Sequence, residues 1–137
     1  MEIRVLRPGD DDLVAAASHL FDGPARPDAT ARFLAEDGHH LLIAYEEGAA
    51  VGFVSGVEIT HPDKGTETFL YELAVDEPFR RRGIGRALVE RLATLAREGG
   101  CYGMWVITDM DNVAARATYE GTAGVPEEDQ VVKVWTF

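Results

Sequence analysis

Cysteine is almost absent from this sequence: Cys101 is the only one in 137 residues, so an internal disulfide is excluded. Disulfides persist in oxidising compartments, and a chain without them suits a reducing one. The sequence also lacks an apolar run long enough to span a membrane, and its charged start, MEIRVLRPGDDD, does not have the pattern of a signal peptide. We therefore expect a cytoplasmic protein without a membrane segment.

Histidine is scarce and is not placed to bind a metal. The four histidines stand at His19, His39, His40 and His61, without the spacing of metal ligands. His39 and His40 are adjacent, and neighbouring side chains on a strand point to opposite faces. We therefore predict no metal site. No Ser–His–acid arrangement is evident, and Cys101 suits a core position better than the role of a nucleophile.

Basic residues are few and unevenly distributed. The chain has 13 Lys and Arg against 24 Asp and Glu, a formal net charge of −11, which argues against non-specific binding to nucleic acid. The charge suits a cationic substrate, although solubility alone explains it equally well. A basic island, Arg80–Arg86, lies within this acidic chain. An anionic cofactor together with a cationic co-substrate would explain that contrast.

The length and the apolar share of 46% indicate one compact domain over residues 1–137. Hydrophobic periodicity and turn residues predict an α/β chain with a mixed sheet and no repeats or linkers. Expected strands lie at 3–6, 39–46, 50–59, 67–75, 102–108 and 131–137, and expected helices at 10–21, 27–37, 84–98 and 111–120. Gly52 and Gly56, inside the third strand, indicate a bulge or a close backbone approach.

One segment, Phe69–Val89, organises this prediction: a strand to Val75, a loop over Arg80–Gly85, and then a helix. A helix start has unpaired backbone N–H groups and a positive potential, so it can bind a phosphate. Gly83 and Gly85 have no Cβ and would let an anion approach the main chain. The loop is surrounded by arginines, which suit phosphate oxygens: Arg80, Arg81, Arg82 and Arg86. On the loop alone, a simple turn with a solvated arginine face is an equally good interpretation.

A second pattern lies downstream. Asn112 and Tyr119 are seven residues apart, nearly two helical turns, so they share one face with Ala115, which would leave room for a ligand. The alternative is structural: Asn112 as a helix cap and Tyr119 as an ordinary half-buried aromatic residue.

Together these residues resemble the acetyl-CoA-binding motif of the GNAT superfamily of N-acetyltransferases. The resemblance rests on Leu73-x-Val75, Arg80-x-x-Gly83-x-Gly85, Asn112 and Tyr119. It implies a single-domain GNAT fold, with a mixed, mostly antiparallel sheet flanked by helices, and acetyl-CoA as co-substrate without a metal.

The resemblance also implies roles for residues. The segment Arg80–Arg86, Ile84 included, would bind the phosphates. Leu73 and Val75 would pair with pantetheine, and the N–H of Val75 would polarise the thioester carbonyl. Asn112 would bind the pantetheine arm, and Tyr119 would protonate the leaving thiolate.

Transfer to an amine also needs a base, because a lysine-like amine has a pKa near 10.4 and is almost entirely protonated at neutral pH. Glu72 is the candidate, since it interrupts an apolar strand close to Val75. The alternative is a structural carboxylate paired with an arginine. Asp109 and Asp111 would bind substrate ammonium groups, or else serve as helix-capping residues.

A narrower resemblance is to the aminoglycoside 3-N-acetyltransferases of type I, whose Tyr-Asp-Leu-Ala-Val segment is similar to Tyr71–Val75. Glutamate replaces aspartate at 72, and the glycine expected four residues after Tyr119 comes one residue late, at Gly124, which leaves the turn there in question. The resemblance implies acetyl transfer by direct attack of a small-molecule amine such as an aminoglycoside. The alternatives are a peptide, protein N-terminal or lysine acetyltransferase, and a non-catalytic acetyl-CoA sensor. An open sheet edge and the terminal strand predicted at Val131–Phe137 could pair in a homodimer.

Overall fold

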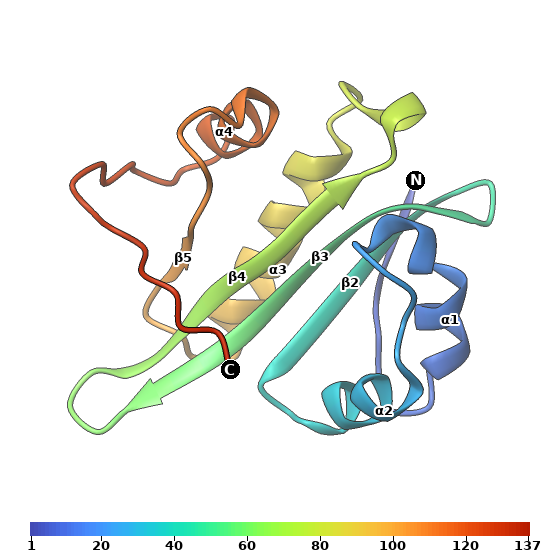
Figure 1. Cartoon of the computed structure of the whole chain (residues 1–137), viewed down its shortest axis with the longest axis horizontal. Coiled ribbons are helices and arrows are strands. Elements are labelled where there is room, and N and C mark those ends of the chain that lie inside the picture. The colour runs from blue at the N-terminus through green and yellow to red at the C-terminus, as the bar shows by residue number, and fades with distance from the viewer.

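A five-stranded sheet with helices on both faces forms the body of the molecule, in a computed structural model that describes residues 1–137 (Figure 1). The strands are β1 (Glu2–Val5), β2 (His39–Glu46), β3 (Ala49–His61), β4 (Gly65–Val75) and β5 (Met104–Val106). The helices are α1 (Asp11–Ala16), α2 (Pro27–Ala35), α3 (Ile84–Glu98) and α4 (Val113–Glu120), with short 3₁₀ turns η1 (Ser18–Leu20) and η2 (Glu77–Phe79).

The strands lie in sequence order, β1 to β5, which is the mixed and mostly antiparallel sheet predicted from the sequence. The first four strands pair antiparallel, and β5 pairs parallel with β4. A parallel pair needs a long crossover, which α3 provides. The parallel pairing is short, because only Thr68–Leu70 of β4 meets Met104–Val106 of β5.

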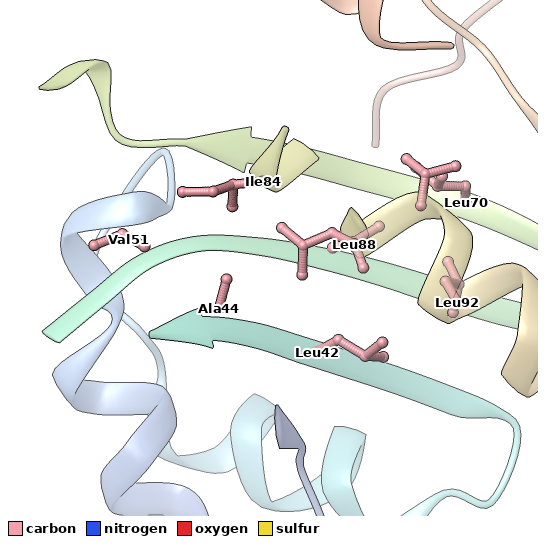
Figure 2. Packing of buried hydrophobic residues seen from close by; sticks show 9 residues of the cluster. Leu42, Ala44, Val51, Leu70, Ile84, Leu88 and Leu92 are labelled. Carbon is pink, nitrogen blue, oxygen red and sulfur yellow. The ribbon is translucent and has the colours of Figure 1, made fainter. Parts of the chain in front are cut away.

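The two faces of the sheet have separate hydrophobic cores. On one face, Leu88 and Leu92 of α3 pack down onto Leu42 and Leu70 of the strands (Figure 2). On the other face, α1 and α2 cover β1, β2 and β3 through a second cluster: Leu6, Val14, Ala17, Leu34, Leu41, Ile43 and Phe53. Consecutive strand residues alternate between the clusters, so the sequence shows continuous apolar runs where both faces are buried.

Both glycines of β3 lie where another group approaches closely, as predicted. A Cβ at Gly52 would lie 3.0 Å from the carbonyl oxygen of Ala74, and one at Gly56 would lie 3.0 Å from Cδ2 of Leu92. The missing side chains therefore let α3 and β4 pack directly on β3.

Three expectations about the elements were wrong. The first helix stops at Ala16 and continues as the separate turn η1, and the predicted strand 102–108 is reduced to Met104–Val106 with exposed residues on both sides. The terminal strand at Val131–Phe137 does not form. That segment is rich in the β-branched and aromatic residues that strands favour, but it pairs with no other strand, and its large apolar side chains are exposed. None of the helices has the length and apolar character needed to cross a membrane.

Candidate active site

A register shift in β4 sets the direction of its side chains. Ser55 of β3 pairs with Glu72 and Gly56 pairs with Leu70, so Tyr71 is left without a partner. Because one extra residue reverses the alternation, Leu70 and Leu73 both pack against the α3 side, and Glu72 turns to the opposite face. The amide of Glu72 donates to the Oγ of Ser55 at 3.2 Å.

Past this bulge, β4 has a free edge. Pairing with β5 ends at Leu70, while β4 continues to Val75. Asp76 donates its N–H to the carbonyl of Val51 at 2.8 Å, beside the register pair Val75–Gly52. In an antiparallel ladder, this makes Val75 a member of a non-hydrogen-bonded pair, and Leu73, two residues before it, is another. The N–H groups of Leu73 and Val75 therefore point away from β3, towards the free edge.

A cleft of about 540 Å³ lies where β4 and the chain after β5 separate. Figure 1 shows β4 and the segment leading to α4 diverging at this point. The lining residues come from η1 and the loop after it, from β3, from β4, from the end of β5 and the segment after it, and from α4: Leu20, Asp22, Phe53, Tyr71, Glu72, Leu73, Ala74, Val106, Ile107, Thr108, Asp109, Asn112, Ala115 and Tyr119.

Glu72 is half-buried in this cleft, and its environment favours the neutral acid. Burial raises the pKa of Glu72, and the negative charge of Asp22 raises that pKa further. A carboxylate with a raised pKa is a better proton acceptor near neutral pH. Glu72 forms no ion pair, so the alternative of a structural partner for an arginine is not observed.

Asn112 lines the cleft and also caps α4. Its Oδ1 accepts a hydrogen bond from the N–H of Ala115 at 3.1 Å. The two interpretations of Asn112 are therefore compatible, because capping uses the oxygen and leaves the Nδ2 amide group as a donor.

Tyr119, on the same helix, is half-buried and packs against the α3-side core. Burial raises the pKa of Tyr119, and the hydroxyl is therefore protonated at neutral pH, the state in which it has a proton to donate. The late glycine does not disturb the helix at this residue. Instead α4 runs on to Glu120, and the hydroxyl of Thr122 donates to the carbonyl of Tyr119 at 2.6 Å.

The loop before α3 has the geometry of an anion site. Gly83, the N-cap of α3, has a φ of 80°, a left-handed conformation that favours glycine, and no side chain caps the helix. The N–H groups of Ile84, Gly85 and Arg86 have no acceptor in the chain. Ile84 contributes only its backbone here, because its side chain is buried in the α3-side core.

The arginines of the loop differ in their contacts. Arg80 Nε donates to the carbonyl of Val75 at 2.9 Å, which ties the loop to the free edge of β4. Arg82 stacks over the ring of Phe79 at 5.1 Å, and Arg86 Nε pairs with Glu90 at 2.8 Å. Arg81, with a φ of 63°, is exposed and has no ion-pair partner. Each of these residues keeps guanidinium N–H groups that can face an anion.

Gly85 has a role that sequence reasoning missed. We expected it to admit an anion, but a Cβ at this position would lie 3.3 Å from Cγ2 of Thr118, on α4. Gly85 therefore allows the start of α3 to pack closely against the helix that carries Tyr119. This contact connects the segment Arg80–Arg86, which we call the anion loop, to the cleft.

The structure brings Glu72, Leu73, Asp109, Asn112 and Tyr119 together around one cleft. The remaining predicted residues do not line it. Val75 follows on the free edge, Asp111 is exposed in the turn before α4, and Arg80–Arg86 forms the neighbouring loop. Sequence reasoning did not identify Asp22 as a residue of the cleft. Its distance from Glu72 along the chain left no local signal.

Comparison with known proteins identifies the chain as a member of a family of acyltransferases. Residues 11–124 match the Acetyltransferase (GNAT) family, so the chain belongs to that family. Acetyltransferases of this family use acetyl-CoA as the acetyl donor. Human N-acetyltransferase 8 is 31% identical over 68% of this chain and 41% of its own length. The N-alpha-acetyltransferase RimI of Mycobacterium tuberculosis is 36% identical over 72% of this chain and 60% of its own length. The chain thus spans about half the length of these relatives.

Solved structures agree on the fold. An aminoglycoside acetyltransferase from a soil metagenomic sample, in complex with sisomicin, superposes with a TM-score of 0.91 over 99% of this chain and 95% of its own, at 21% identity. A second soil aminoglycoside acetyltransferase has a TM-score of 0.84 at 28% identity, over 99% of this chain and 98% of its own. The predicted GNAT fold is confirmed. A third solved structure, the aminoglycoside N-acetyltransferase AAC(6′)-Iy, superposes with a TM-score of 0.78 at 22% identity over 98% of this chain and 93% of its own; its name gives the 6′ type, whereas the narrower resemblance is to the 3-N type.

Substitution of Asn112 separates its two roles. We expect Asn112→Ala to lower the free energy of unfolding by about 0.5–2 kcal/mol, the usual effect of losing a helix cap, in urea denaturation. Asn112→Asp keeps the capping oxygen but lacks the Nδ2 donor. We expect this variant to retain wild-type stability and to bind acetyl-CoA more weakly in calorimetry. Wild-type affinity in Asn112→Asp would show that the residue only caps the helix.

Proposed function

We propose that this protein is an acetyl-CoA-dependent N-acetyltransferase that acetylates a primary amine of a cationic small molecule, such as an aminoglycoside. One observation carries the proposal: Glu72 and Tyr119 line the same cleft, at the free edge of β4, and the pKa of each is raised by burial. A proton acceptor and a proton donor placed in one cleft are what transfer from a thioester to an ammonium substrate requires.

Two parts of the chain fit acetyl-CoA. The free N–H groups at the start of α3 and the arginines of Arg80–Arg86 match its phosphates. The outward N–H groups of Leu73 and Val75 match an extended amide-bearing arm, which would pair with β4 as an added strand does. The Nδ2 of Asn112 would donate to the same arm. Acetyl-CoA supplies the acetyl thioester.

Each residue of the cleft would then have a separate role in the transfer of the acetyl group. Glu72 takes a proton from the substrate ammonium, directly or through one water, so that the neutral nitrogen can attack the thioester carbonyl. The N–H of Val75 polarises that carbonyl, a role that usually contributes strongly to catalysis. As the N–C bond forms and the C–S bond breaks, the hydroxyl of Tyr119 gives its proton to the departing sulfur. The second proton of the nitrogen leaves to solvent, and no acyl-enzyme forms.

The charge around the cleft supports a cationic acceptor. Asp22, Glu72 and Asp109 come from three separate segments and line the same cleft, and no Lys or Arg is part of the lining. An acidic cleft concentrates cations and so favours substrates with more than one ammonium group. Asp111 lies just outside, in the turn before α4, and would contact only a large substrate.

A second candidate is acetylation of a protein N-terminus, which the similarity to the N-alpha-acetyltransferase RimI of Mycobacterium tuberculosis favours.

A panel of acceptors separates the two candidates. We expect thiol release from acetyl-CoA with aminoglycosides and other polyamines and little with N-terminal or lysine peptides. Turnover confined to peptides would overturn the small-molecule proposal.

Tyr119→Phe distinguishes a catalyst from an acetyl-CoA sensor. We expect kcat to fall by roughly 10²–10⁴-fold, the usual contribution of general acid–base catalysis. The Kd for acetyl-CoA should be unchanged, because the aromatic ring and its packing remain. Tyr102→Phe, which removes an exposed tyrosine hydroxyl outside the cleft, is the matched control. Equal turnover in Tyr119→Phe and the wild type would contradict the acid role.

The pH profile tests the coupling between Asp22 and Glu72. Protonated Glu72 cannot accept a proton, so kcat/KM should fall as the pH drops through its pKa. The charge of Asp22 raises that pKa, so Asp22→Asn should lower it and move the acid limb of the profile to lower pH. When the same acceptor is used for all variants, the titration of its amine affects every profile equally, so the difference between profiles reports on the protein.

Asp12→Asn, an exposed acid outside the cleft, is the control for net charge. It should leave the profile in place. An equal displacement in both variants would assign the effect to overall charge and not to Asp22.

We also propose that two copies associate through the C-terminal segment Val131–Phe137. The segment has the composition of a strand, and the outer edge of β5 is free. In a two-fold dimer, the segment of each copy would pair with the β5 edge of the other copy. Sedimentation velocity should show a dimer for the wild type and a monomer for the double variant Val132→Asp with Val134→Asp. Val125→Asp, at an exposed valine outside the segment, should stay dimeric. A monomeric wild type at all concentrations would overturn this proposal.

A further inference from the structure

Three aromatic rings meet beside the cleft, on the face of the sheet opposite α3. Phe69 of β4 and Trp105 of β5 are stacked, with ring centroids 4.3 Å apart and an angle of 24° between planes. Tyr71 meets Phe69 edge-on, with centroids 5.9 Å apart. Two of these rings remain in contact with solvent, because Tyr71 is 63% exposed and Trp105 is 40% exposed.

The backbone explains this arrangement. Thr68 and Leu70 are buried, so Phe69 between them points to the other face. The parallel register pairs Phe69 with Trp105 and so stacks their rings. Tyr71 is the unpaired residue of the bulge; it precedes Glu72 in the chain, and its exposed ring contacts Phe69. Helices α1 and α2 pack over β1–β3 and do not extend over β4 and β5, where the C-terminal segment passes in front of the sheet (Figure 1).

The aromatic cluster is continuous with the acidic cleft. Tyr71 lines the cleft together with its chain neighbour Glu72, and Asp22 and Asp109 line the same space. Exposed aromatic side chains with a polar rim mark ligand-binding surfaces. Aromatic faces attract both C–H groups of a ring and cations placed above them. A ligand with ammonium groups on a rigid ring would satisfy the two surfaces together.

We propose that Tyr71, supported by Phe69 and Trp105, is a stacking platform for a sugar ring of the acceptor, and that the acceptor is therefore an amino sugar. This inference rests on the proposed N-acetyltransferase function. The ring lies on Tyr71, while its ammonium groups face the carboxylates of the cleft. A linear polyamine has the charges but no ring, and it gains nothing from the platform.

Steady-state kinetics with sisomicin and spermidine test the platform. We expect Tyr71→Ala to raise the KM for sisomicin by roughly tenfold, with kcat and the KM for acetyl-CoA unchanged, because stacking binds the ground state and the transition state equally. Tyr71→Phe, which keeps the ring, should restore the wild-type KM. The KM for spermidine should be the same in all three proteins.

A binding experiment gives a readout that does not depend on turnover. The chain has two tryptophans, so Trp135→Phe, outside the cleft, leaves Trp105 as the only tryptophan. Titration with sisomicin should change the fluorescence of Trp105 in a saturable way. Spermidine, added to the same total concentration of ammonium groups, should not change it. Adding Tyr71→Ala to this variant should weaken the sisomicin response by a similar factor.

The outcomes separate the platform from the function it rests on. Turnover of sisomicin with an unchanged KM in Tyr71→Ala would overturn the platform and leave the acetyltransferase proposal intact. Equal fluorescence responses to sisomicin and spermidine would also overturn it. A saturable, Tyr71-dependent response without turnover of any amine would support the platform and contradict the acetyltransferase proposal.

Discussion

The free edge of β4 is the feature on which the rest of the site depends. A bulge at Tyr71 and the short pairing with β5 leave the end of β4 without a neighbour, so its outward N–H groups have no strand to bind. An unpaired edge is a liability in a sheet, and it persists here beside a cleft that contains two groups suited to proton transfer. The same bulge turns Glu72 towards Asp22 and places Tyr71 on the surface. One inserted residue thus sets the direction of both the proposed base, Glu72, and the exposed ring of Tyr71.

The second determinant is the contact between α3 and α4. Gly85 at the start of α3 lies against Thr118, and Thr118 is the neighbour of Tyr119 in α4. Gly121, at the end of α4, lies near the side chain of Arg86. The anion loop and the candidate acid are therefore positioned by one packing contact between small residues. A phosphate held at the loop would define where the rest of an extended ligand meets the free edge.

Much of the fold followed from the sequence because the signals are local. Continuous runs of apolar, aromatic and β-branched residues predicted β2, β3 and β4, and helical spacing with a glycine stop predicted α3. Of the residues that the motifs pointed to, the structure places Glu72, Leu73, Asp109, Asn112 and Tyr119 around the candidate cleft and Arg80–Arg86 in the loop beside it. Asp22 was missed because its meeting with Glu72 depends on how the chain between α1 and α2 crosses the sheet. The strand at Val131–Phe137 was wrong because β-branched and aromatic residues give only a propensity, and a strand also needs a partner.

Amide protection of β4 on binding of acetyl-CoA tests the central claim most directly. Hydrogen exchange followed by NMR resolves single N–H groups. The account predicts that saturating acetyl-CoA slows exchange at Leu73 and Val75, whose N–H groups point to the free edge. Ala74 between them belongs to a hydrogen-bonded pair with β3 and should change little. Unchanged exchange at Leu73 and Val75 while acetyl-CoA is bound would contradict the account, because the co-substrate would then lie elsewhere.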